Sequence, residues 1–241
     1  MSAENTGFLY PFIEAAERDA GPLLTELAAS ARAKAAQSAA LQQATLTACA
    51  DRVAACAAAM AERFAAGGRM YAFGNGGSST DCATFAALFS SPPGAGRPLP
   101  ALNLAADQAV VTALGNDVGF DLVFSRQIIA HAGGRDIAAA FSTSGNSRDL
   151  MAALVEARGR GLLTVGFAGY DGGEMASSGV VDYCFVVGSQ SIHRIQESQA
   201  LLGYHLWTAV QQRFADKVDS SAHPDVQNYP PSRPTPEGGA R

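Results

Sequence analysis

The sequence is poor in charge and in cysteine. Charged residues make up 16% of the 241 residues, the net charge is −5, and no basic cluster stands out, which argues against direct nucleic-acid binding. The four cysteines form no CxxC pair, so their number alone indicates no metal site. Cys49 and Cys56 are seven residues apart in an alanine-rich segment, as expected for free thiols on one buried helix face.

Long apolar stretches are also missing. No run of about 18 residues lacks charged or polar side chains, so no membrane span is expected. The N-terminus lacks the basic and then apolar order of a signal peptide. We therefore predict a cytoplasmic protein with no membrane partner. Hydrophobic residues still make up 48% of the chain, which is enough to build a sizeable core.

The N-terminal part, residues 1–66, is predicted to serve oligomerisation. It begins with an apolar cluster at residues 8–13, of the kind that docks on the body of a protein or on a neighbouring subunit. Residues 22–66 are rich in Ala, Leu and Glu, with apolar residues at helical spacing. This pattern predicts a hairpin of two helices, divided near residues 33–38.

Residues 67–216 alternate between predicted strands and helices and read as the main domain. The order of strand and helix repeats about five times, which predicts an α/β fold with a parallel sheet covered by helices on both faces. A final helix is expected over residues 191–214. Residues 217–241 read as a proline-rich tail, either solvated and disordered or a docking peptide. The expected strands are 69–73, 99–104, 136–141, 162–167 and 182–187.

A hydroxyl-rich loop, residues 142–147, follows the predicted strand 136–141 and leads into a helical pattern. A helix N-terminus offers free backbone N–H groups and positive partial charge, and short hydroxyls add donors without bulk. This is the chemistry of a phosphate cradle. The alternative is a simple N-cap. Four hydroxyls within six residues favour the cradle; they belong to Ser142, Thr143, Ser144 and Ser147.

A glycine-rich loop, residues 74–79, follows the first predicted strand. It lacks the GxGxxG spacing and the later acidic residue of a dinucleotide-binding fingerprint. It also lacks the Gly-Lys-Ser/Thr of a Walker A loop. We interpret it as a second loop that approaches the same ligand, because both loops leave the carboxyl ends of strands.

Together these motifs resemble the sugar isomerase (SIS) family, and within it the branch of bacterial phosphoheptose isomerase and the DnaA initiator-associating protein. The resemblance covers roughly residues 40–215 and rests on five motifs in order. They are residues 74–78 with Asp81 and 85–87, residues 115–117, residues 142–147, residues 164–166 with 169–173, and residues 194–197. It implies a five-stranded parallel sheet in a three-layer sandwich. It also implies a homotetramer with phosphosugar sites between subunits.

The resemblance further implies roles for individual residues. The hydroxyl-rich loop, with Ser142, Thr143, Ser144 and Ser147, should hold the phosphate. Asn75, Gly76 and Ser78 should approach the sugar. Asp117 and Gln196 should line the site.

The sequence departs from the isomerase pattern at the positions that carry the chemistry. Moving a carbonyl between C1 and C2 needs a base and an acid or metal. The family's zinc-dependent members use a His and a Glu after the glycine-rich loop, and a Gln and a His on the last helix. Here these positions hold Thr84, Leu88, Gln196 and Tyr204. Thr and Leu do not bind zinc as those ligands do, so no cofactor is predicted, and zinc stays the alternative although most of the family's ligands are absent.

His193 is the candidate for a relocated catalytic group, because it shares a helix face with Gln196 three residues later. The alternative is a capping or interface residue. Two functions stay open at this point. One is an isomerase acting on sedoheptulose 7-phosphate or a similar sugar phosphate without the family's zinc mechanism. The other is a non-catalytic tetramer that senses a phosphosugar or docks a protein partner.

Overall fold

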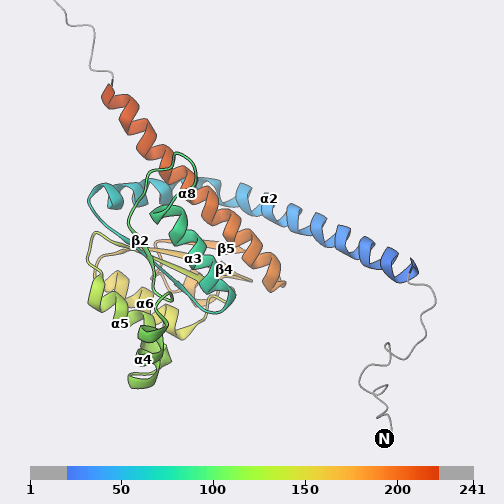
Figure 1. The fold of residues 1–241 in the computed structure, drawn as a ribbon, viewed down its shortest axis with the longest axis horizontal. Helices are drawn as coiled ribbons and strands as arrows, with labels where there is room; N and C mark the ends of the chain where they lie inside the picture. The colour runs from blue at the N-terminus through green and yellow to red at the C-terminus, as the bar shows by residue number, and fades with distance from the viewer. Residues whose placement is uncertain (1–20, 223–241) are drawn as a thin grey trace, which may run out of the picture.

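The computed structural model describes the backbone of residues 21–222. The predicted apolar cluster at residues 8–13 and the segment after residue 222 lie outside this range. Five parallel strands form one sheet in the order β2-β1-β3-β4-β5 (Figure 1). The strands are β1 (Met70–Gly74), β2 (Ala101–Asn103), β3 (Ile137–Ser142), β4 (Leu163–Gly169) and β5 (Tyr183–Val187).

Helices cover both faces of the sheet, which confirms the predicted three-layer α/β sandwich. One hydrophobic cluster joins α2, α3 and α8 to one face of the sheet. The second joins α5, α6 and α7 to the other face. The helices are α2 (Gly21–Ala65), α3 (Gly77–Ser90), α4 (Gln108–Asp117), α5 (Val123–His131), α6 (Arg148–Gly159), α7 (Gly173–Ser177) and α8 (Ile192–Ala222), with a 3-10 turn η2 (Phe120–Leu122) before α5.

The predicted N-terminal hairpin is wrong, because α2 is one continuous helix of 45 residues. Residues 33–38 contain neither Gly nor Pro, and their Ala, Lys and Gln residues favour helix, so nothing breaks the chain there. The first half of α2 extends away from the body (Figure 1) and exposes Leu23, Leu24 and Leu27. By length and composition α2 could cross a membrane, although buried helices of soluble proteins pass the same test.

The C-terminal helix is also longer than predicted. The helix α8 ends at Ala222, so the boundary of the tail does not fall at residue 217. Its buried residues Ile195, Leu202 and Leu206 recur at helical spacing and face the sheet. The cysteines behave as predicted, because all four thiols are free and Cys49, Cys56 and Cys82 are buried.

An aromatic stack forms the centre of the core on the α3 and α8 side. Phe167 is fully buried, and its ring lies 4.1 Å from that of Phe141 in a stacked arrangement. We expect Phe167→Ala to lower the free energy of unfolding by about 3–5 kcal/mol, since it removes these contacts and leaves a cavity. Urea unfolding measures the change. Phe120→Ala, at an exposed ring, should change it by less than about 0.5 kcal/mol, and a similar loss in both variants would contradict the prediction.

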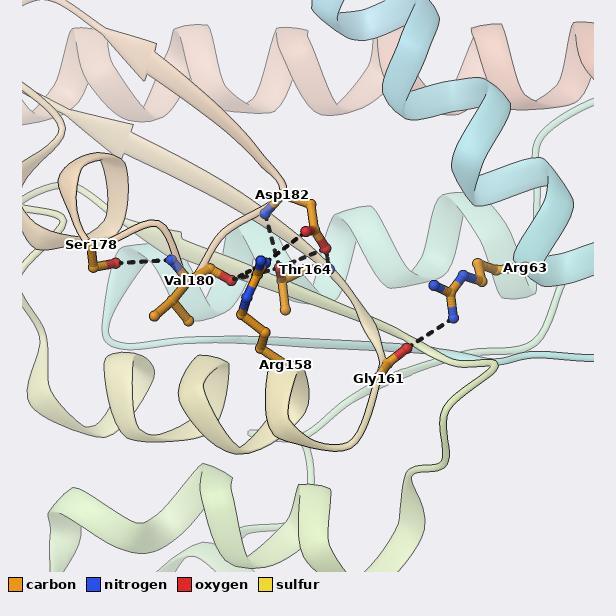
Figure 2. Close-up of polar contacts among 7 residues, drawn as sticks. All are labelled: Arg63, Arg158, Gly161, Thr164, Ser178, Val180 and Asp182. Carbon is orange, nitrogen blue, oxygen red and sulfur yellow. Dashed lines mark hydrogen bonds and ion pairs between the residues drawn. The ribbon is translucent and has the colours of Figure 1, made fainter.

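A network of hydrogen bonds fixes the start of β4 against the segment leading into β5 (Figure 2). The buried Thr164 hydroxyl donates to the Val180 carbonyl at 2.9 Å or to Asp182 Oδ2 at 3.0 Å, and it accepts from the Asp182 backbone N–H at 2.9 Å. Arg158 of α6 pairs with Asp182 Oδ1 at 2.7 Å. This hydrogen-bond network holds two neighbouring strands in register.

Replacing the Thr164 hydroxyl should be costly for this reason. Thr164→Val removes the hydroxyl's hydrogen bonds to the Asp182 N–H and the Val180 carbonyl, which keep only their longer bonds to the Thr164 carbonyl at 3.1 Å and to Arg158 at 3.4 Å. We expect a loss of about 0.5–1.5 kcal/mol in unfolding free energy. Thr164→Ser keeps the hydroxyl and serves as the control. Equal losses in the two variants, measured by urea unfolding, would show that the methyl group and not the hydroxyl matters.

Candidate functional site

The candidate site lies where the strand order reverses. From β1 the chain passes to β2 on one side, and then to β3 on the other side of β1. Gly74 at the end of β1 pairs with Phe141 near the end of β3. The glycine-rich loop and the hydroxyl-rich loop therefore leave the sheet side by side. In open parallel sheets, ligands bind at this switch point.

The hydroxyl-rich loop gathers three of its side chains. Ser142 Oγ lies 3.2 Å from Ser147 Oγ and 3.4 Å from Ser144 Oγ, and it accepts the Gly145 backbone N–H at 3.0 Å. Ser147 is the N-cap of α6, yet its side chain makes no capping hydrogen bond. The N-cap alternative is therefore not what the structure shows. The hydroxyls converge in front of a helix N-terminus, where an anion is favoured.

The start of α7 holds the hydroxyl-rich loop in place. The Gly145 carbonyl accepts from the Met175 N–H at 2.9 Å, and Asn146 Oδ1 accepts from the Glu174 N–H at 2.8 Å. Gly145 has a φ of 67°, and a Cβ there would lie 2.1 Å from the Gly172 carbonyl oxygen. Only glycine fits this position, so the loop and the start of α7 form one rigid unit.

The glycine-rich loop is tied to the hydroxyl-rich loop through Asp149, a residue that the sequence reasoning missed. Asn75 Nδ2 donates to Asp149 Oδ2 at 2.8 Å, and Asp149 is buried in the first turn of α6. Its signal in the sequence was weak, because an acidic residue in a first helical turn also favours the helix by itself. Asp149 positions Asn75, and the predicted neighbour Ser78 is buried beside it in the first turn of α3.

Gln196 reaches the same place from α8. A Cβ added to Gly77 would lie 2.3 Å from Gln196 Nε2, so the amide packs directly on the backbone at the start of α3. Gly76, with a φ of 55°, turns the chain just before this contact. Three predicted residues, Asn75, Gly76 and Gln196, thus lie around the N-terminus of α3.

Asp117 and His193 lie apart from this group. Asp117 is exposed at the end of α4, and the hydrogen bond described for its side chain comes from the adjacent Asn116. His193 lines a groove of about 670 Å³ between α2 and α8, together with Lys34 and Ser38. No hydrogen bond between described residues links His193 to the hydroxyl-rich loop. Its catalytic role is therefore without structural support.

The four positions of the family's zinc set lie along α3 and α8. Thr84 and Tyr204 are exposed, and Leu88 is partly buried against the aromatic core. Among the residues of the described range, no group of three or more His, Cys, Asp or Glu side chains is gathered as a metal site.

Asp81 lies one helical turn before Thr84, on the face of α3 that also carries Leu88. Its Oδ2 atom is buried and has no hydrogen-bond partner among the described residues. Burial raises the pKa of this carboxyl from its usual value to about 6. A carboxylate that is desolvated and unpaired in this way is expensive for stability, which marks it as a candidate for function.

The fold is that of an α/β protein with two loops side by side at the switch point of a parallel sheet. Residues 35–169 match the SIS domain, and the chain belongs to this family, as the motifs predicted. A phosphoheptose isomerase of Solidesulfovibrio magneticus is 42% identical over 170 residues, which cover 70% of this chain and 82% of that protein. One of Geobacter sulfurreducens is 39% identical over 166 residues, covering 68% and 87%.

The solved structures agree with the sequence relatives. The phosphoheptose isomerase GmhA from Neisseria gonorrhoeae has a TM-score of 0.72 and 30% identity, and the match covers 77% of this chain and 99% of that one. Phosphoheptose isomerases are thus similar to this chain in sequence and in fold.

Proposed function

We propose that the protein binds a phosphorylated sugar at the switch point, between the glycine-rich and hydroxyl-rich loops, and interconverts its aldose and ketose forms. The observation that carries this proposal is the convergence of the Ser142, Ser144 and Ser147 hydroxyls at the N-terminus of α6, beside the glycine-rich loop. In the proposal this hydroxyl-rich loop, with Thr143, holds the phosphate. Asn75, Gly76, Ser78 and Gln196 contact the sugar.

Sedoheptulose 7-phosphate is the substrate we propose first, because phosphoheptose isomerases resemble this chain both in sequence, at 42% identity, and in fold, with a TM-score of 0.72. We place the protein in the cytoplasm, where sugar phosphates are found. We also propose a homotetramer in which Asp117 lines a site completed by a neighbouring subunit. The exposed apolar residues Leu23, Leu24 and Leu27 of α2 support an assembly of this kind.

The family's zinc does not fit the residues present. Of the four ligand positions only Gln196 keeps a donor of the family type, and Leu88 offers none. In this proposal the reaction proceeds without the zinc set, and no step depends on a metal.

The presence of Leu88 and Tyr204, in place of the family's Glu and His, also favours a second candidate. This candidate is a non-catalytic tetramer that senses the sugar phosphate or docks a protein partner. Calorimetry with sedoheptulose 7-phosphate, and with the unphosphorylated sugar as control, tests the shared part of both candidates. An isomerase assay with added zinc, without it and with chelator separates them. Turnover that is insensitive to chelator supports the proposed isomerase. Binding without turnover in any of these conditions supports the second candidate.

A further inference from the structure

A small cavity lies between α3, α8 and the end of β3. Its volume is about 20 Å³, which is room for roughly one water molecule. Phe141 of β3 forms part of its wall. The remaining lining residues are Asp81, Thr84, Phe85, Leu88, Ala200 and Gly203.

Asp81 is the ionisable residue of this lining. Its buried Oδ2 atom has no partner, while the residue as a whole is half-buried and so is accessible from outside the body. Asp81 lies four residues after Gly77, whose backbone packs on the Gln196 amide. The carboxylate is therefore on α3 between the Gln196 contact and Leu88.

The surroundings leave this carboxylate without a charged partner. Thr84, Leu88 and Ala200 carry no charge. The pKa of the adjacent Cys82 thiol is raised, mainly by burial and secondly by the charge of Asp81, so this thiol provides no charged partner either. On α8 the charged Arg194 and Glu197 line the groove toward α2 instead. Within the described chain, burial is the cause that raises the Asp81 pKa to about 6. A carboxylate with such a pKa is a competent base near neutral pH.

We infer that Asp81 is the catalytic base of this protein and carries the proton that the residues at positions 84, 88 and 204 are unable to carry. The inference rests on the proposed isomerase function. The ionised carboxylate takes the proton from C1 of the ketose. The C–H electron pair forms the C1=C2 bond, and the pair of the C2 carbonyl moves to O2, beside the Gln196 amide.

The second half of the reaction returns the proton. The enediolate exchanges its hydroxyl proton between O1 and O2 through solvent water. The Asp81 carboxylic acid then gives its proton to C2 while C1=O forms. One C–H bond is broken and another is made, and no external oxidant or reductant is consumed. The base must be ionised at the start, so kcat should fall as the pH drops below about 6.

The test compares Asp81→Asn with the wild-type protein on sedoheptulose 7-phosphate. We expect kcat to fall by about 10²–10⁴-fold, with the low-pH limb of the profile lost and with KM little changed. Deuterium wash-in from heavy water at C1, followed by NMR, should fall in parallel. Asp51→Asn, at an exposed carboxylate of α2, should leave both rates unchanged. Calorimetry confirms that Asp81→Asn still binds the substrate.

Each outcome has a distinct meaning. Turnover by Asp81→Asn at the wild-type rate would overturn the role of Asp81 and leave the proposed function standing. If the wild-type protein shows no turnover and no wash-in, both the proposed isomerase and the role of Asp81 are overturned.

The pH dependence of thermal stability reports the burial of the Asp81 carboxyl. Because the folded pKa is raised, the stability from protonated Asp81 is fully present below about pH 4 and is lost as the pH rises through about 6. Asp81→Asn lacks this loss. Its Tm should exceed the wild-type Tm at neutral pH, and the gap should close toward about pH 4. A gap independent of pH would argue against a buried, ionising carboxyl.

Discussion

Gly145→Ala is expected to abolish binding of a ketose phosphate while leaving the protein folded. The new Cβ would lie 2.1 Å from the Gly172 carbonyl oxygen, which is backbone and is unable to rotate away. The φ of 67° adds strain for any side chain. The hydroxyl-rich loop must then move away from the start of α7. Displacements of about 1 Å cost about 100-fold in well-positioned sites, so we expect Kd to rise at least 100-fold.

Calorimetry with sedoheptulose 7-phosphate measures this loss. Gly159→Ala is the matched control, because a Cβ there meets nothing within 4 Å and the residue ends the same helix, α6. It should bind like the wild-type protein. Retained affinity in Gly145→Ala, with a normal Tm, would mean that the phosphate does not depend on this loop.

The hydroxyl-rich loop could be located from the sequence because its signal is local. Hydroxyls, a glycine and a following helical pattern stand together in residues 142–147, and the physics of a helix N-terminus is the same in every fold. The parallel sheet that brings both loops to one edge was also accessible, since alternating strands and helices lead to such a sheet, whereas the strand order came only from the structure. The family match agrees with both inferences.

The contacts between distant segments were not accessible in this way. The hydrogen bond from Asn75 to Asp149 joins residues 74 positions apart, and nothing in either local pattern announces it. The placement of His193 depends on which side of α8 faces α2, and a shared face with Gln196 did not decide that. The predicted break in α2 was wrong because residues 33–38 contain no helix-breaking residue, and α2 runs through them without interruption.

The two parts of the proposed site are held by different contacts. The hydroxyl-rich loop, which we propose binds the phosphate, accepts hydrogen bonds from the start of α7, and Asp149 just after it bonds to Asn75. The positions that the family resemblance assigns to proton transfer are Leu88 on α3, where it packs against the core, and Tyr204 on α8. Because neither residue belongs to the hydroxyl-rich loop, we expect substitutions there to alter the chemistry with little effect on phosphate binding.

The combined variant Thr84→His, Leu88→Glu and Tyr204→His is expected to create zinc-dependent turnover. Together with Gln196 it supplies the four side chains that the family resemblance assigns to zinc, on two helices that already line one cavity. We expect about one bound zinc per chain and a rate on sedoheptulose 7-phosphate about 10²-fold or more above that of the wild-type protein. Addition of chelator should remove the gain.

Two controls decide whether the gain comes from the intended chemistry. Thr84→His with Tyr204→His, without the change at Leu88, lacks the new carboxylate, so any turnover that it shows should still depend on Asp81. Asp81→Asn added to the combined variant should now cost little, because the new carboxylate takes over proton transfer; the same change should cost 10²–10⁴-fold in the wild-type background. If Asp81→Asn were equally damaging in both backgrounds, Asp81 would act by positioning α3 and not as the base. Zinc binding without turnover would instead show that subunit geometry, and not ligand identity, limits this site.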